Sequence, residues 1–133
     1  MKYQIATTPE QSRRLIACGV NPDSADMFYT NYTTKLNNKM PIVKTAPLEI
    51  RKDLIPAWSL SALLALFPME VNEDGLHTVF HLIYYPDELK WAAEYYDYTM
   101  DKNLCSKRDY NPIEACVQVI EYLTANSFTL NTK

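Results

Sequence analysis

Two adjacent segments decide the fold class: HTVFHLIYY at residues 77–85 and KWAAEYYDYT at residues 90–99. The first is rich in β-branched and aromatic residues, which are enriched in strands. A turn sequence, PDE at 86–88, separates the segments. In the second segment Trp91, Ala93 and Tyr95 occupy every second position, which favours a strand. Its AAE run makes a helix the alternative. Together the segments predict an antiparallel β-hairpin.

Helix signals flank this hairpin on both sides. TPEQ at 8–11 combines an N-cap, a proline at the first helical position and a glutamine three residues after the cap, which predicts a helix at about 9–18. Gly19 is expected to end it. NPDS at 21–24 predicts a short second helix of about two turns, over 22–28. NPIE at 111–114 is read as another capping box, and the spacing of apolar residues after it predicts an amphipathic helix at about 112–125.

The segment IPAWSLSALLALFP at 55–68 predicts a central helix. Ser59 is a suitable N-cap, and the residues after it are apolar on almost every side, which is typical of a buried helix. Trp58 is expected in the core. Replacing Leu63 or Leu64 with alanine is therefore expected to cost about 2–5 kcal/mol of stability.

The remaining segments carry weaker signals. Residues 29–53 are polar and broken by proline, and MPIVK at 40–44 is their one plausible strand. Residues 100–110 are expected to form a polar loop. We predict a single α+β domain over residues 1–133, with two N-terminal helices, a buried central helix, the hairpin, and a C-terminal helix packed on it. A third strand beside the hairpin is left open.

Composition excludes several classes of function. The chain has 133 residues, enough for one core but not for two domains of normal size. Its two glycines cannot build a glycine-rich nucleotide loop. The net charge is −3, with eight bases and five acids in residues 1–60 and five bases and eleven acids in residues 61–133. Weak nucleic-acid binding by the basic half is a minor alternative, because an acidic protein repels the phosphate backbone.

The cytoplasm is the expected compartment. The N-terminal residues lack the apolar region of a signal peptide, and the longest apolar stretch, 54–69, is broken by prolines and shorter than the roughly 20 residues of a membrane span. Three cysteines, odd in number and without a CxxC spacing, fit free thiols in a reducing compartment. No cofactor and no metal are expected.

Two pairs of residues are candidate reactive groups. His77 and His81 would share one face of a strand roughly 13 Å apart, too far for one metal ion. Glu94 and Asp97 lie among aromatic residues, as in a glycosidase, but their positions on a strand point to opposite sides. A hydrolytic enzyme that uses these acids or the histidines is kept as an alternative.

The three thiols differ in their expected surroundings. Cys18 and Cys116 fall on apolar helix faces and are expected to be inert. Cys105 lies beside two bases in the predicted loop, so it is expected to be the one reactive thiol. No motif supports a catalytic role, and a free surface thiol is the expected state.

Tyrosine is the chain's most distinctive residue type, with ten copies. Tyrosine is enriched at protein interfaces, so the cluster in the hairpin is the candidate binding face. Part of it must pack in the core, because a hairpin needs one packed face. The candidate binding residues are Tyr84, Tyr85, Tyr95, Tyr96 and Tyr98.

Three motifs in order along the chain, ADM at 25–27, IPAWSLSALL at 55–64 and NPIEAC at 111–116, resemble a family of short proteins from gut bacteria, their phages and prophages. Asn126-Ser127 departs from the glycine expected after the last helix. The family has no assigned activity, so the resemblance implies no functional residue. The predicted function is non-enzymatic binding of a partner protein by a small accessory factor of mobile-element type; self-association into a homo-oligomer is left open.

Overall fold

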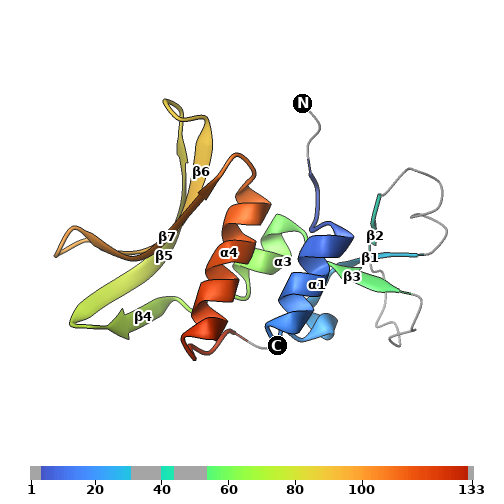
Figure 1. Ribbon diagram of the computed structural model, residues 1–133, viewed down its shortest axis with the longest axis horizontal. Coiled ribbons are helices and arrows are strands. Elements are labelled where there is room, and N and C mark those ends of the chain that lie inside the picture. Colours follow the sequence, from blue (N-terminus) through green and yellow to red (C-terminus); the bar gives the residue numbers. More distant parts are fainter. Residues whose placement is uncertain (1–3, 31–39, 44–53, 132–133) are drawn as a thin grey trace.

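The computed structural model describes residues 4–30, 40–43 and 54–131, and it confirms the mixed α+β fold. The described strands form two antiparallel sheets, one of order β2-β1-β3 and one of order β4-β5-β6-β7. Figure 1 shows helix α4 between the larger sheet and the rest of the molecule, with α1 and α3 beyond it. The turn end of the β5–β6 hairpin projects away from the body of the molecule.

Helix α1 (Pro9–Ala17) begins as predicted. The Thr8 side chain accepts from the Gln11 amide, the Gln11 side chain accepts in return from the Thr8 amide, and Gly19 follows the helix with a φ of 90°. The predicted second helix over 22–28 is wrong. The start signal produces only one 3-10 turn, η1 (Pro22–Ser24), and the chain then enters strand β1 (Met27–Tyr29).

Strand pairing explains why the second helix stops so early. β1 pairs on one side with β2 (Ile42–Val43) and on the other with β3 (Ile55–Ala57). Ladder hydrogen bonds on both sides outweigh a weak local helix preference. The strand predicted at 40–44 is confirmed at Ile42–Val43, and most of the 29–53 segment lies outside the described residues.

The central helix is shorter than predicted and is not buried all round. α3 (Leu60–Leu64) begins after Ser59, whose hydroxyl accepts from the Ala62 amide as expected. Trp58 and Leu63 are fully buried, but Leu64 is 38% exposed. The prediction that both leucines lie in the core is therefore wrong for Leu64, because a five-residue helix at the edge of the core presents only one side to it.

The larger sheet contains the predicted hairpin, β5 (Leu76–Tyr85) and β6 (Lys90–Asp97), and the helical alternative for its second arm is wrong. β4 (Glu70–Glu73) adds a strand on one side. The predicted loop over 100–110 is also wrong, since β7 (Lys102–Asp109) pairs along β6. Extended pairing with β6 satisfies the backbone of this polar segment without requiring apolar side chains of its own.

Helix α4 (Pro112–Ala125) covers the inner face of this sheet, as predicted for the C-terminal helix. The Asn111 side chain caps it by accepting from the Ile113 amide. The expected capping box is incomplete, because the Glu114 carboxylate bonds to α1 instead. Asn126 ends the helix, and Ser127 has a φ of 63°, the conformation for which glycine is usual.

Candidate functional site

The outer face of the larger sheet has no described helix over it and carries the most concentrated polar cluster of that sheet. His81 of β5 lies opposite Glu94 of β6, and Glu94 lies opposite Ser106 of β7. Side chains at opposed positions in antiparallel strands point to the same face. Three adjacent strands therefore bring these three groups together, whereas the neighbouring row, with Tyr95 and Cys105, points into the core.

Glu94 is a buried carboxylate that uses both of its oxygens. It is 2% exposed; Oε1 lies 2.7 Å from His81 Nε2, and Oε2 accepts from Ser106 Oγ at 2.5 Å and from Asn103 Nδ2 at 3.1 Å. Burial alone would raise the pKa of Glu94, but the hydrogen bonds from Ser106 and His81 outweigh it and hold the pKa below its usual value. Glu94 is therefore ionised at neutral pH.

His81 connects this carboxylate to the surface. Its Nδ1 lies 3.0 Å from the Tyr98 hydroxyl, and its ring stacks on Tyr96 with the centroids 5.4 Å apart. The Tyr96 hydroxyl donates to Asp101. The side chain of His81 is 15% exposed, whereas Tyr98 is 67% exposed. The cluster therefore extends from the interior of the sheet to solvent.

The five predicted binding tyrosines occupy different environments. Tyr95 is fully buried and donates to the Pro68 carbonyl at 2.9 Å, and burial raises its pKa. Tyr84 and Tyr98 are exposed, while Tyr85 and Tyr96 are half-buried. Tyr95 thus belongs to the core, and the other four border solvent.

Glu94 and Asp97 are not brought together as an acid pair. Asp97 accepts from the Thr99 and Met100 amides through Oδ1 and from the His77 amide through Oδ2. Hydrogen bonds from these amides, that of Met100 foremost, lower the pKa of Asp97. The two carboxylates share no hydrogen-bond partner, so Asp97 stabilises the β6–β7 turn and takes no part in the Glu94 cluster.

The two histidines are also separate. His77 contacts Asn72 at 3.2 Å, whereas His81 contacts Glu94 and Tyr98. Within residues 4–30, 40–43 and 54–131, no group of three His, Cys, Asp or Glu side chains is placed to hold a metal ion.

The prediction of Cys105 as a surface thiol is wrong. It lies in β7, is 6% exposed, and burial raises its pKa to about 11. Cys116 is fully buried in α4, where burial raises its pKa to about 12. Both thiols are protonated at neutral pH and inert, whereas Cys18 is partly exposed.

Ser106 and Asn103 are members of the cluster that the sequence did not reveal. Both lie in the segment that the sequence predicts to be a loop, because polar residues on both faces of this strand hide its alternation. The signal that the sequence does offer lies in β5 and β6, where His81 and Glu94 each stand between apolar or aromatic neighbours.

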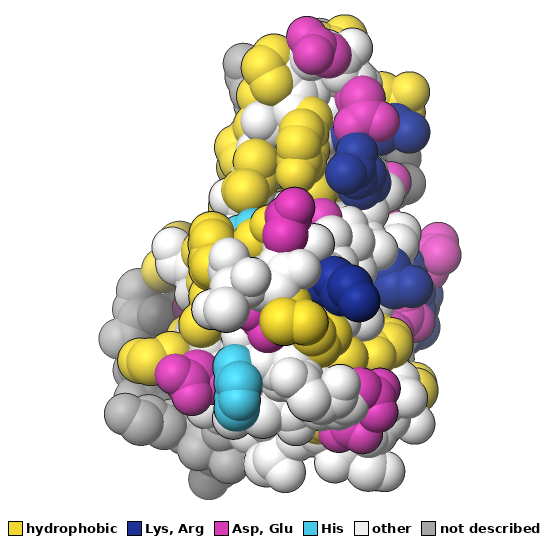
Figure 2. Space-filling view, turned by 90° about the vertical axis from the view of Figure 1, so that its left-hand side faces the viewer, with side chains coloured by type: hydrophobic (Ala, Val, Ile, Leu, Met, Phe, Trp, Pro, Cys, Tyr) yellow, Lys and Arg dark blue, Asp and Glu magenta, His cyan; other side chains and the backbone are white. Residues whose placement is uncertain are grey.

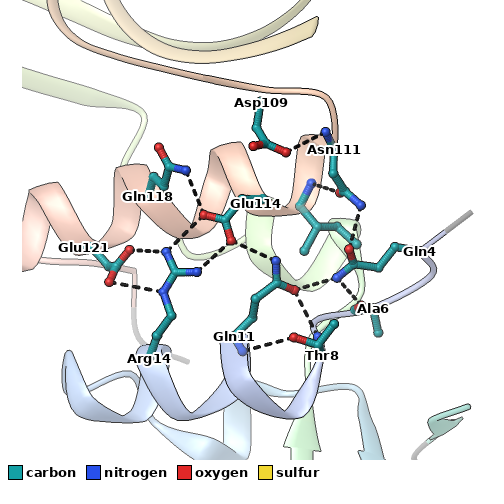
Figure 3. A network of polar contacts seen from close by, with 11 residues as sticks. Gln4, Ala6, Thr8, Gln11, Arg14, Asp109, Asn111, Glu114, Gln118 and Glu121 are labelled. Carbon is teal, nitrogen blue, oxygen red and sulfur yellow. Dashed lines mark hydrogen bonds and ion pairs between the residues drawn. The ribbon is translucent and has the colours of Figure 1, made fainter. Parts of the chain in front are cut away.

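A second polar cluster joins helices α1 and α4 (Figure 3). Arg14 lies between two carboxylates of α4, with Nη1 2.7 Å from Glu114 Oε1 and Nη2 2.5 Å from Glu121 Oε1. Gln11 donates to Glu114 at 2.9 Å, and Gln4 contacts both Gln11 and Asn111. Every polar group in this cluster has a protein partner, which is the pattern of a structural contact between helices.

A hollow of about 150 Å³ lies where the end of α1 meets the C-terminal segment, and its lining includes Cys18, Leu66 and Phe128. None of its lining residues carries a charge. It offers neither an acid–base pair nor an ion pair to a ligand.

Comparison of the chain with protein-family models, with curated proteins and with solved structures found no match in any of the three. Among the described helices, none has both the length and the apolar character needed to cross a membrane. The functional argument therefore rests on the surfaces and clusters of this chain.

Proposed function

We propose that this protein binds a partner protein by accepting an extended segment of it as an additional strand beside β5. The observation that carries the proposal is an open strand edge. β6 pairs with β5 along Val79–Tyr85, but β4 pairs only with Leu76–Val79. Residues 80–85 therefore have no strand partner on the β4 side within the described chain. Every second residue there directs its amide and carbonyl outward, as strand addition requires.

The chemistry of this open edge differs from that of the other edges. The sequence at 80–85, FHLIYY, contains no acidic or basic side chain apart from His81. The outer strand β7 carries Lys102, Lys107 and Arg108, and β4 carries glutamates at both ends. Charged residues on edge strands discourage pairing with other chains. The charged side chains of β4 and β7 therefore discourage pairing with another chain at those edges, whereas residues 80–85 of β5 remain open to it.

Aromatic side chains support this edge on both faces. Tyr84 packs against Trp91 with the ring centroids 5.1 Å apart, and Tyr85 lies 4.5 Å below the Arg108 guanidinium. Ile83 and Leu89 are 36% and 63% exposed. Figure 2 shows hydrophobic side chains running up the projecting part of the molecule, with basic side chains along one side. An added strand would bury apolar area as well as form backbone hydrogen bonds.

The proposed occupant is an uncharged segment of about six residues with apolar or aromatic side chains on both faces. Such a segment matches the side chains of residues 80–85, and cross-strand pairs of this kind each contribute roughly 0.2–1 kcal/mol. With this binding activity, the protein is proposed to act as a small cytoplasmic accessory factor of phage or prophage type.

A displayed peptide library tests the proposal. Peptides selected on the full chain are expected to be extended, uncharged and rich in β-branched or aromatic residues. Ile83→Lys, which places a charge beside the open edge, is expected to weaken their binding at least tenfold. Every second amide of a bound peptide faces β5. N-methylation of that set of amides is expected to weaken binding, whereas N-methylation of the other set is expected to leave it unchanged.

Val43→Lys is the matched control, since Val43 is 60% exposed on β2, at the edge of the smaller sheet. Peptides that bind equally well to wild type and Ile83→Lys would overturn the proposal. If the wild-type protein forms a dimer and Ile83→Lys dissociates it, the strand beside β5 comes from a second copy of this chain. That result would overturn the proposal of a different partner protein.

A further inference from the structure

The arrangement of Glu94, His81 and Tyr98 has a chemical consequence that strand addition does not use. The three groups form a line from a buried carboxylate, through an imidazole, to an exposed phenol, joined by contacts of 2.7 and 3.0 Å. Each member is nearer to solvent than the one before it. The order of groups, acid, imidazole and hydroxyl, is that of a hydrolase triad, with a phenol in place of serine.

The proton positions follow from the charge of Glu94. An ionised carboxylate only accepts, so His81 Nε2 carries a proton and donates it to Glu94. In the neutral imidazole this leaves the Nδ1 lone pair free, and the Tyr98 hydroxyl donates to it. Glu94 thus fixes the tautomer in which Nδ1 can accept the phenolic proton.

The rest of the cluster holds this geometry. Ser106 and Asn103 fix the other oxygen of Glu94, and the Tyr96 ring stacks on the imidazole. Glu94 carries a buried charge and accepts from three donors. An apolar side chain would fill the same place in the sheet without either. Burying a carboxylate is costly unless it is fully hydrogen-bonded, as it is here.

We propose that Tyr98 is a nucleophile that accepts an acyl group from an uncharged ester, with His81 as its base and Glu94 as the positioning residue. The Tyr98 Oη forms a bond to the ester carbonyl carbon, and the bond from that carbon to the leaving oxygen breaks. The phenolic proton passes to His81 Nδ1 and then to the leaving oxygen. The products are an acylated tyrosine and a free alcohol, and no oxidant or cofactor takes part.

The surrounding charge selects the substrate class. Glu94 is ionised, and Asp101 lies against Tyr96, whose ring centroid is 4.8 Å from that of Tyr98. Arg108, whose positive charge also acts on Glu94, is already paired with Glu88. A carboxylate or phosphate ester would approach these acids with an unfavourable like charge. An uncharged carboxylic ester meets no such repulsion.

Acetylation by p-nitrophenyl acetate at neutral pH tests the proposal, with each tyrosine followed by peptide mass spectrometry. Tyr110 is the internal reference, because it is 70% exposed against 67% for Tyr98. In the described part of the chain its ring neighbours Lys90, with Nζ 5.1 Å from the ring centroid, and no imidazole contacts it. General-base assistance is worth about 10²–10⁴-fold in enzymes. Tyr98 is therefore expected to react at least tenfold faster than Tyr110.

His81→Gln is the decisive variant, because glutamine keeps a donor for Glu94 but cannot accept the phenolic proton. It is expected to reduce the Tyr98 rate to that of Tyr110. His77→Gln, on the same strand, is the matched control and is expected to leave the ratio unchanged. Glu94→Gln is expected to lower the ratio while the Tyr110 rate stays constant, whereas unfolding would raise the rates of both tyrosines.

Equal rates for Tyr98 and Tyr110 in the wild-type protein would overturn the proposal, and so would a ratio that survives His81→Gln. Peptide binding at residues 80–85 is measured separately, so either proposal can fail without the other.

Discussion

The pair Leu63 and Leu64 provides a direct test of how α3 packs. Leu63 is fully buried in the cluster that includes α4, whereas its neighbour Leu64 is 38% exposed. Leu63→Ala removes three buried carbons and leaves a cavity, which is expected to cost about 2–5 kcal/mol. Leu64→Ala removes the same atoms from a partly solvated site, where substitutions cost about 0.5 kcal/mol, and alanine's slightly better helix propensity offsets part of that.

Urea unfolding followed by tryptophan fluorescence measures both variants against wild type. The buried Trp58 lies close to α3 in the sequence and reports on the same core. The slope of the free energy of unfolding against urea is expected to stay the same in both variants, so that only the midpoint moves. Equal losses of stability would refute the burial difference, and a larger loss for Leu64→Ala would place the opposite face of α3 in the core.

Three further predictions concern the polar groups and the thiols. Arg14→Met is expected to cost about 1–3 kcal/mol in thermal or urea unfolding, because both carboxylates of α4 lose their charged partner; a stability loss that is no larger in low salt than in high salt would contradict an ionic contribution. The lowered pKa of Glu94 means that its ionised form stabilises the fold above its ordinary value of 4.5, and that this stabilisation disappears as the pH falls through the lower folded-state value. The free energy of unfolding of Glu94→Gln is therefore expected to decline less steeply than that of wild type below about pH 4.5, and parallel acid profiles would argue against the shift. In the folded protein Ellman's reagent is expected to label Cys18 first, with Cys105 and Cys116 protected until unfolding, because burial keeps both protonated; rapid labelling of the Cys18→Ser variant would show that a buried thiol is accessible.

Local sequence signals predicted the secondary structure correctly where the interactions that stabilise an element lie within that element. The capping residues before α1 and α4 satisfy orphan amides within a few residues. The composition of residues 77–85 and the alternation of residues 90–99 predicted a hairpin whose strands meet the turn at Tyr85 and Lys90, as they do in the structure, although β6 ends at Asp97. Local signals failed at residues 22–28 and 102–109. Pro22–Ser24 forms only a 3-10 turn, whereas Met27–Tyr29 and Lys102–Asp109 become strands because other strands lie beside them and outweigh the weak preference of each segment.

The candidate site shows the same division. The sequence identified His81, Glu94 and Tyr98 as residues of interest, yet it treated the histidines as a pair and the acids as a pair. In the structure one histidine, His81, groups with one acid, Glu94, because these two residues lie opposite each other in β5 and β6. Register is set by the pairing of whole strands and cannot be obtained from spacing within one strand.

By itself, the sequence determined the α+β class, the two long helices, the hairpin and the exclusion of glycine-rich nucleotide loops. Only the tertiary structure decided that β7 completes the sheet, that Cys105 and Tyr95 lie in the core, and that residues 80–85 keep an open edge. These outcomes depend on contacts between segments distant in the chain, where hydrogen bonds and buried area contributed by other strands outweigh the preference of any single segment.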